Sequence, residues 1–319
     1  MTKATGEAIA AAREIVYGVM QPTPTHSYPL LNARTGANVF VKHENHTPVG
    51  AFKVRGGLNF MTNYRKAGNT AGVVTATRGN HGQSIALAAS KVGVEATIVV
   101  PEGNSTEKNA AMAALGGNLV VHGHDFQAAA EHAAHLSETE GLHMLPSFHE
   151  DLVAGVATYA MELFEAAPDL DAVYAPIGLG SGICGVISAR DALGLKTEVI
   201  GVVAGGAPCY ALSFEAGAPI STNSADTMAD GMACRTPVAA AVETIRQGAA
   251  RVVRVSDAEI EAAMRAYFTD CHNVVEGAGA APLAALIQER DAMAGKRVGL
   301  ILSGGNIDTG LYAKVLAAA

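Results

Sequence analysis

Lys53 stands out in the stretch VGAFKVRGG (49–57), because its neighbours Phe52 and Val54 are apolar. The ordinary explanation is a surface lysine at the start of a helix, which extends its charged end into water. The alternative is an amine kept in a partly dry pocket for covalent chemistry with a carbonyl compound. A single lysine does not decide between the two, so the loops that would surround it have to be considered.

Two glycine-bearing loops each follow an apolar run and precede a helix-forming stretch. TRGNHGQS (77–84) follows GVVTAT (72–77), and PIGLGSGICG (176–185) ends the run LDAVYAPIG (170–178). Glycine lets the backbone approach a ligand closely, and the free N–H groups of a helix start bind anions. The second loop therefore has the composition of a phosphate-binding nest.

The second loop also matches the GxGxxG pattern of dinucleotide-binding proteins, with Gly180, Gly182 and Gly185. That function requires an acidic residue about 20 positions later, at the end of the next strand, to bind the ribose. The next apolar run, VIGVVAGGAP (199–208), contains no carboxylate, and Glu198 lies at its wrong end. The sequence therefore favours a phosphate over a dinucleotide.

A third loop, LSGGNID (302–308), ends the last apolar run of the chain. Ser303 would present its hydroxyl at the carboxyl end of a strand, where it can meet a ring nitrogen. A reactive amine, a phosphate nest and a strand-end serine suit a ligand that carries an aldehyde, a phosphate and a pyridine ring. Pyridoxal phosphate has these three parts.

Short apolar runs alternate with alanine-rich stretches that have helical spacing, which predicts an α/β fold with parallel sheets covered by helices in both lobes. One set of strands is expected in GVVTAT, EATIVVP (95–101), NLVVHG (118–123) and HMLPS (143–147), and another in LDAVYAPIG, TEVIGVVAG (197–205), RVVRVS (251–256) and RVGLILSGG (297–305). We expect residues 72–147 to form a small mobile substrate-binding domain, and residues 1–71 with 148–319 a large cofactor-binding domain. Ligands of such sheets bind beyond the carboxyl ends of the strands.

The amino-acid composition indicates which kinds of binding partner to expect. The 319 residues carry a net charge of −8, and the 22 lysines and arginines form no basic stripe, so a nucleic-acid partner is not expected. The sequence shows neither an apolar run of membrane-spanning length nor a signal peptide, and its four cysteines form no CxxC pair. We expect a cytoplasmic enzyme with a small-molecule substrate and no membrane partner.

Five motifs occur in the order and spacing typical of the fold-type II, or β-family, pyridoxal-phosphate enzymes. They are KHENHTPVGAFKVRGG (42–57), TRGNHGQS, GLGSGICG (178–185), VVEGAGAA (274–281) and SGGNID (303–308). The chain resembles most the threonine/serine dehydratase and serine racemase branch, from about residue 20 onwards. The resemblance implies a two-lobed fold, pyridoxal 5'-phosphate as cofactor and an amino acid as substrate, and we expect a homodimer.

The resemblance also implies roles for individual residues. Lys53 would bind the cofactor covalently and act as the catalytic base. The other expected cofactor-binding residues are Asn80 at the 3′-hydroxyl, the phosphate loop Gly178, Leu179, Gly180, Ser181 and Gly182, Glu276 near the ring, and Ser303 at the pyridine nitrogen. The expected substrate-binding residues are Thr77, Asn80 and His81, which match the family loop for the substrate carboxylate, and Arg78. Arg78 departs from the family pattern and would contact either the distal end of the substrate or a surface carboxylate. Leu179 and Ser181 replace two glycines of the family loop.

A serine opposite the ring nitrogen leaves that nitrogen largely unprotonated, so the ring is a weaker electron sink and elimination is favoured. The expected reaction removes water from a β-hydroxy-α-amino acid, such as threonine, serine, 3-hydroxyaspartate or 3-phenylserine, and gives a 2-oxo acid and ammonia. The alternatives are an amino-acid racemase, a β-replacement synthase of the same fold, or a non-catalytic small-molecule-binding protein.

Two differences from the sequences of related enzymes bear on the racemase and synthase alternatives. Racemases of the branch have a serine at the position of Arg78, and a guanidinium group does not readily accept a proton. Synthases of the fold typically have GNTG where this chain has GNHG (79–82). No metal site is expected, because the run GVVAGGAPCYALSF (201–214) lacks the carboxylates that hold a divalent ion in some members of the branch.

Overall fold

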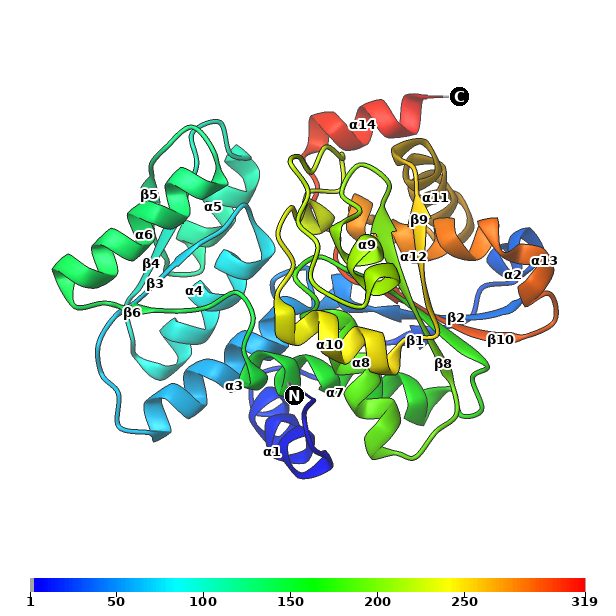
Figure 1. Cartoon of the computed structure of the whole chain (residues 1–319), viewed down its shortest axis with the longest axis horizontal. Coiled ribbons are helices and arrows are strands. Elements are labelled where there is room, and N and C mark those ends of the chain that lie inside the picture. The colour runs from blue at the N-terminus through cyan, green and yellow to red at the C-terminus, as the bar shows by residue number, and fades with distance from the viewer. Residues whose placement is uncertain (1–2, 319) are drawn as a thin grey trace.

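The computed structural model describes residues 3–318, and the strands in this range form two sheets. The large sheet has the order β1-β2-β10-β7-β8-β9, and the small sheet has the order β5-β4-β3-β6. Every neighbouring pair in these sheets is parallel except β1 and β2. Figure 1 shows the two sheets in separate lobes, which confirms the predicted α/β class.

The strands of the large sheet are β1 (Thr25–His26), β2 (Asn38–His43), β7 (Ala172–Pro176), β8 (Glu198–Ala204), β9 (Arg251–Val255) and β10 (Arg297–Leu302). Successive residues of a strand face opposite sides of the sheet. Val173 and Val199 accordingly lie in one hydrophobic core, while Tyr174 and Ile200 lie in the other. This burial on both faces explains the continuous apolar runs of the sequence.

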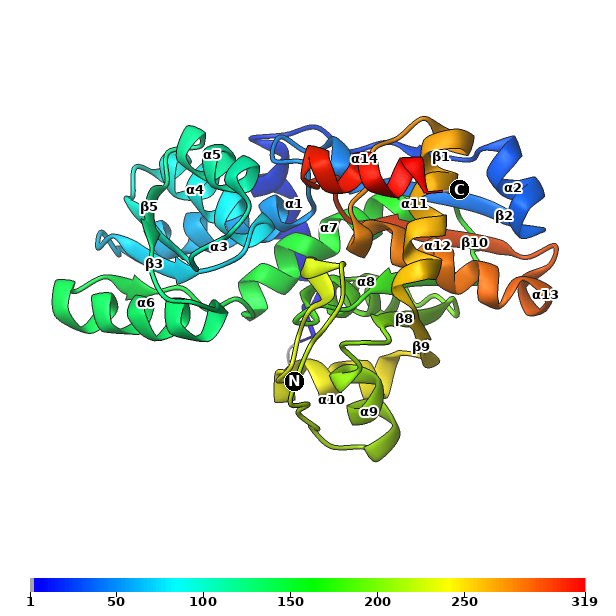
Figure 2. The same cartoon turned by 90° about the horizontal axis from the view of Figure 1, so that it is seen from above.

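Helices cover both faces of the large sheet. They are α1 (Gly6–Tyr17), α2 (Pro29–Thr35), α7 (Glu150–Ala166), α8 (Ser181–Ala192), α9 (Cys209–Ala216), α10 (Ala239–Gly248), α11 (Asp257–Cys271), α12 (Gly277–Gln288), α13 (Arg290–Met293) and α14 (Thr309–Ala317). Core residues of α11 and α12 lie on one side and those of α7, α8 and α10 on the other. Figure 2 shows these layers from above. Among the helices of the described chain, none has both the length and the apolar character needed to cross a bilayer.

The small lobe contains β3 (Val73–Ala76), β4 (Ala96–Val100), β5 (Asn118–Val121) and β6 (His143–Met144), with α4 (Asn80–Val92), α5 (Thr106–Ala114) and α6 (Phe126–Glu140). Helix α3 (Lys53–Lys66) contributes Leu58 and Met61 to the same core as Val73 and Ile98. The lysine helix therefore packs against the small sheet. The domain limits at 72 and 147 stay a prediction, and residues 1–2 and 319 of the expected large domain lie outside the described range.

Strand order places the three predicted loops near one another. Strand β10 lies between β2 and β7, so the segment after β10 and the loop after β7 leave neighbouring positions of the large sheet. Strand β3 lies between β4 and β6 in the small sheet, and the loop 77–84 begins at its carboxyl end. The three loops thus meet where the two sheets face each other.

Candidate active site

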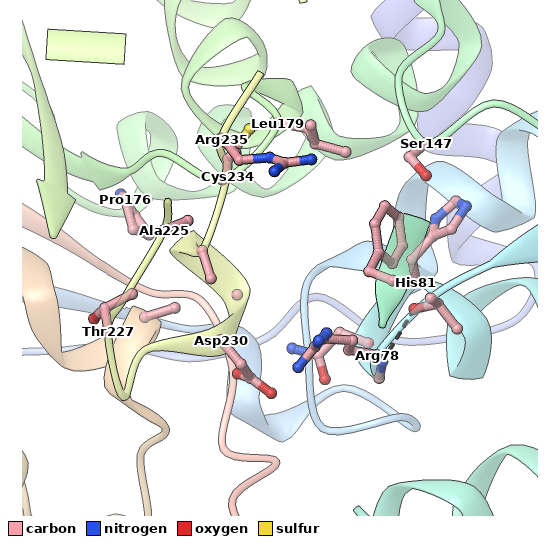
Figure 3. A pocket seen from close by; sticks show the side chains of 18 of the residues that line it. Arg78, His81, Ser147, Pro176, Leu179, Ala225, Thr227, Asp230, Cys234 and Arg235 are labelled. Carbon is pink, nitrogen blue, oxygen red and sulfur yellow. Dashed lines mark hydrogen bonds between the residues drawn. The ribbon is translucent and has the colours of Figure 1, made fainter. Parts of the chain in front are cut away.

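A cavity of about 680 Å³ lies between the two lobes, at the carboxyl ends of β3, β7 and β10. Figure 3 shows part of its wall. The residues expected from the sequence to form the site all line this cavity: Lys53, Thr77, Arg78, Asn80, His81, Gly178, Leu179, Gly180, Ser181, Gly182, Glu276 and Ser303. Their individual roles remain predictions, but the fold brings them together.

Lys53 is the first residue of α3, and its side chain is partly buried. Its Nζ donates a hydrogen bond to Ser181 Oγ at 3.0 Å and lies 5.0 Å from the centroid of the Phe52 ring. Burial lowers the pKa of the Lys53 amine to about 8. A substantial share of this amine is therefore neutral near pH 7 to 8, and a neutral amine is both a nucleophile and a base.

The start of α3 is fixed from two sides. The backbone N–H of Phe52 donates to the carbonyl of Ser303 at 3.0 Å, which joins the lysine segment to the end of β10. Ser84 Oγ of α4 donates to the carbonyl of Lys53 at 2.6 Å. These contacts hold the lysine between the large sheet and the loop of the small lobe.

A buried ion cluster, formed by Lys42, Glu44, Arg55 and Glu162, lies at the next turn of α3. Arg55 donates hydrogen bonds to both carboxylate oxygens of Glu44 and to both of Glu162, at 2.6 to 2.9 Å. Lys42 Nζ donates to Glu162 at 2.6 Å. The side chains of Lys42, Glu44 and Arg55 have no exposed surface. The cluster ties α3 to β2, the 3₁₀ turn after it (Glu44–His46) and α7.

The loop from Gly178 to Gly182 connects β7 to α8 in a conformation that explains two of its glycines. A Cβ atom on Gly178 would lie 2.3 Å from the carbonyl oxygen of Gly231, and Gly180 has a φ of 98°. Leu179 and Ser181 need no such freedom: within residues 3–318, the non-glycine residues with positive φ are Asp169 and His272. The two replacements of family glycines are thus compatible with the loop. The free N–H groups at the start of α8 suit a phosphate.

Gly178→Ala is expected to lower cofactor affinity at least tenfold, because its Cβ cannot be placed without moving the backbone of Gly231. Gly182→Ala is the matched comparison, since a Cβ there meets Phe52 and Tyr159 at 3.6 Å, an ordinary contact. Titration of the cofactor-free variants with pyridoxal phosphate measures the effect. Equal affinities of the two variants would contradict this account of the loop.

Asn80 and Glu276 face each other across the cavity. Asn80 Nδ2 donates to the two carboxylate oxygens of Glu276 at 2.8 and 3.1 Å, and Asn306 Nδ2 donates to Asn80 Oδ1 at 2.8 Å. Asn306 also donates to the carbonyl of Val49 at 2.8 Å. Asn306 therefore fixes the orientation of the Asn80 amide. Asn306 lies in the motif SGGNID, but its neighbours in the sequence do not indicate this contact.

Further contacts cross between the lobes. Lys108 of α5 forms an ion pair with Asp230, which belongs to the 3₁₀ turn Asp230–Met232 of the large lobe. Glu107 accepts a hydrogen bond from the backbone N–H of Thr309 at 3.0 Å. Sequence reasoning missed these residues, because nothing in their local pattern indicates that they meet.

The carboxyl group of Glu276 is buried at the base of the cavity. Burial and the charge of Asp230 raise its pKa to about 7, although Lys108 and the hydrogen bond from Asn80 act in the opposite direction. Glu276 is thus close to half protonated at neutral pH in the protein without cofactor.

This shift predicts a pH-dependent stability. Because the pKa of Glu276 is higher in the folded protein than its ordinary value of 4.5, its contribution is complete below that value and is lost as the pH rises through about 7. Between pH 5 and pH 8 the cofactor-free protein should lose up to about 3 kcal/mol relative to Glu276→Gln. Denaturant unfolding at both pH values measures this, with Glu138→Gln on α6 as control. Parallel pH profiles of wild type and Glu276→Gln would contradict it.

The loop after β3 is ordered by Thr77. Its Oγ1 accepts hydrogen bonds from the backbone N–H groups of Gly79 at 3.0 Å and Gly82 at 3.4 Å. His81 is buried, and its Nε2 has no hydrogen-bond partner in the described part of the chain. Burial lowers the pKa of His81 to about 3, so the ring is neutral. An unpartnered buried nitrogen at a cavity wall indicates a ligand atom that completes the site.

His43 and His46 lie outside this cavity. The His43 Nε2 lies 2.9 Å from the Tyr28 hydroxyl, and the two imidazole rings stack with centroids 5.0 Å apart. Burial lowers the pKa of His43 to about 3. Within residues 3–318, no three side chains of His, Cys, Asp or Glu are arranged to hold a metal ion.

Such a site, between two largely parallel sheets, is typical of an enzyme with an aldehyde-bearing phosphate cofactor. Comparison with known families identifies the cofactor. The family model "Pyridoxal-phosphate dependent enzyme" matches residues 16–304, and the chain belongs to this family.

Similar curated proteins and solved structures indicate which branch of this enzyme family the chain resembles. The chain is 34% identical over 309 residues to an L-threo-3-hydroxyaspartate ammonia-lyase of a Pseudomonas species, covering 97% of each protein. It is 32% identical to an L-threonine ammonia-lyase of Thermotoga maritima, covering 98% of this chain and 78% of that protein. The structure of maize serine racemase superposes with a TM-score of 0.92 at 28% identity, covering 98% of this chain and 96% of that one. These matches confirm the resemblance to the dehydratase and racemase branch.

Proposed function

We propose that the protein is an ammonia-lyase that removes water from a β-hydroxy-α-amino acid and releases a 2-oxo acid and ammonia. The observation that carries this function is the Lys53 amine, which has a lowered pKa and lies beside the glycine loop of the cavity. The ammonia-lyase names of the relatives from Pseudomonas and Thermotoga maritima support it.

The residues present fit pyridoxal phosphate. The loop Gly178 to Gly182 offers backbone N–H groups for the phosphate, and Ser303 lies at the end of the neighbouring strand for the pyridine nitrogen. When bound, the cofactor supplies an electron sink for the negative charge that develops at the substrate α-carbon. A serine hydroxyl does not hold the ring nitrogen protonated as an aspartate would, so loss of a β-substituent is favoured over a long-lived carbanion.

Lys53 supplies the proton transfer. Its neutral amine removes the proton from the α-carbon, and the electron pair of that C–H bond forms the double bond between the α- and β-carbons. The β-hydroxyl leaves as water, taking up the proton that Lys53 removed from the α-carbon. The released enamine becomes an imine, which water hydrolyses to the 2-oxo acid and ammonia. The neutral ring of His81 and the loop around Thr77 lie beside the lysine and orient the substrate carboxylate.

The test is a screen of the holoenzyme with threonine, serine, 3-hydroxyaspartate and 3-phenylserine for release of 2-oxo acid and ammonia. Release from at least one of them supports the proposal. A holoenzyme that binds these amino acids but releases ammonia from none would overturn it. Chiral analysis of the remaining substrate tests racemisation, which we expect to be slow because Arg78 stays protonated. The cytoplasmic location, a role in amino-acid catabolism and the homodimeric state are further parts of this proposal.

A further inference from the structure

The cavity extends beyond the residues expected to bind the cofactor. Its outer part is lined by the start of α6 and by the segment 223–236, which leads to α10. Arg78 and Arg235 both line the cavity and are exposed to it. Figure 3 shows their side chains extending from opposite walls of the pocket. Arg78 follows β3 of the small lobe, while Arg235 belongs to the large lobe.

Three other charged side chains of the cavity have hydrogen-bond or ion-pair partners. Lys108 pairs with Asp230, Glu276 accepts from Asn80, and Asp125 accepts from the backbone N–H of Ala128 at 2.8 Å.

The guanidinium groups of Arg78 and Arg235 differ from these charged groups in their contacts. For the part of the chain that the structure describes, neither Arg78 nor Arg235 makes a side-chain hydrogen bond or an ion pair. The carboxylate of Asp226 also lines the cavity but pairs with neither. An arginine stays charged at every physiological pH, and its planar fork matches a carboxylate.

We propose that Arg78 and Arg235 bind a second acidic group of the substrate, on the side of the β-carbon, one from each lobe. This inference rests on the proposed function and adds its substrate class, a β-hydroxy-α-amino acid with a distal carboxylate such as 3-hydroxyaspartate. Arg235 is the specificity residue that the sequence analysis did not identify. Charge-assisted hydrogen bonds to a carboxylate favour such a substrate by about 10- to 100-fold for each arginine.

The experiment compares Arg78→Met, Arg235→Met and wild-type holoenzyme on 3-hydroxyaspartate and on threonine. We expect kcat/KM for 3-hydroxyaspartate to fall about 10- to 100-fold in each variant, mainly through KM, whereas kcat/KM for threonine should change less than about threefold in Arg235→Met. Arg235→Lys should restore part of the loss. Arg290→Met, on exposed helix α13 away from the cavity, is the control.

Binding is measured separately with aspartate and alanine, which carry the amine and carboxylate but no β-hydroxyl. Weaker binding of aspartate alone in the variants supports the inference even if no substrate is dehydrated, so it is tested independently of the proposed reaction. Equal losses for both ligands, or a loss of pyridoxal phosphate from Arg235→Met, would overturn it. The second result would mean that Arg235 binds the cofactor phosphate instead.

Discussion

Lys53→Ala is expected to reduce ammonia release at least about 10³-fold and to remove the visible absorption band of the lysine-bound cofactor. In the proposed mechanism, this variant lacks both the amine that bonds the cofactor and the base that removes the α-proton, and a positioned general base alone contributes a factor of about 10² to 10⁴ to the rate. No other lysine can replace it, since the second lysine of the cavity, Lys108, is paired with Asp230. Steady-state rates and absorption spectra of the purified variant provide the measurement.

Lys66→Ala is the matched control, because Lys66 is an exposed residue in the last turn of the same helix. It should retain both the rate and the spectrum. A Lys53→Ala protein that keeps most of its activity, or Lys66→Ala that loses it, would show that the catalytic lysine lies elsewhere.

Arg55→Met is expected to lower the free energy of unfolding by about 3–5 kcal/mol. Removal of the guanidinium leaves Glu44 and Glu162 buried with Lys42 as the remaining cation of the cluster, and several hydrogen bonds are lost at once. Water does not replace those bonds, since Glu44 has no exposed surface. Denaturant unfolding of the cofactor-free protein measures the change.

Arg13→Met is the comparison, because Arg13 forms a partly exposed pair with Glu165. Its loss should change the free energy of unfolding by less than about 1 kcal/mol. Arg55→Lys keeps the positive charge but not the planar guanidinium group, so it should lower the free energy of unfolding by an intermediate amount. If Arg55→Met destabilises no more than Arg13→Met, the buried ion cluster does not hold α3 in place.

Much of the fold could be predicted from apolar runs alone. The two expected strand sets match the two sheets, because parallel strands buried on both faces must be apolar throughout. Strands β1 and β2 were not in either set. β1 is only two residues long and pairs at an edge, and β2 contains Lys42, whose charge is buried in an ion cluster that no local pattern reveals.

The candidate site was predicted where its residues belong to one motif. The adjacent sequence is enough to mark Lys53, the loop 178–182 and Ser303 as candidate site residues. Asn306 and Arg235 were missed because their importance depends on side chains that approach from a distant segment. In the same way, a lone glycine such as Gly178 gives no sign that the carbonyl of Gly231 lies against it.

Two of the contacts between the lobes, Asn80 with Glu276 and Lys108 with Asp230, affect how substrate enters and leaves the cavity. To widen the cavity, both contacts must break, so the shut form is favoured before any substrate arrives. Less of the substrate's binding energy is then spent on closing the lobes, but the rate of entry is limited by how often they separate. Because one of these contacts ends on a carboxyl group with a pKa of about 7, acidity would tune that rate as well.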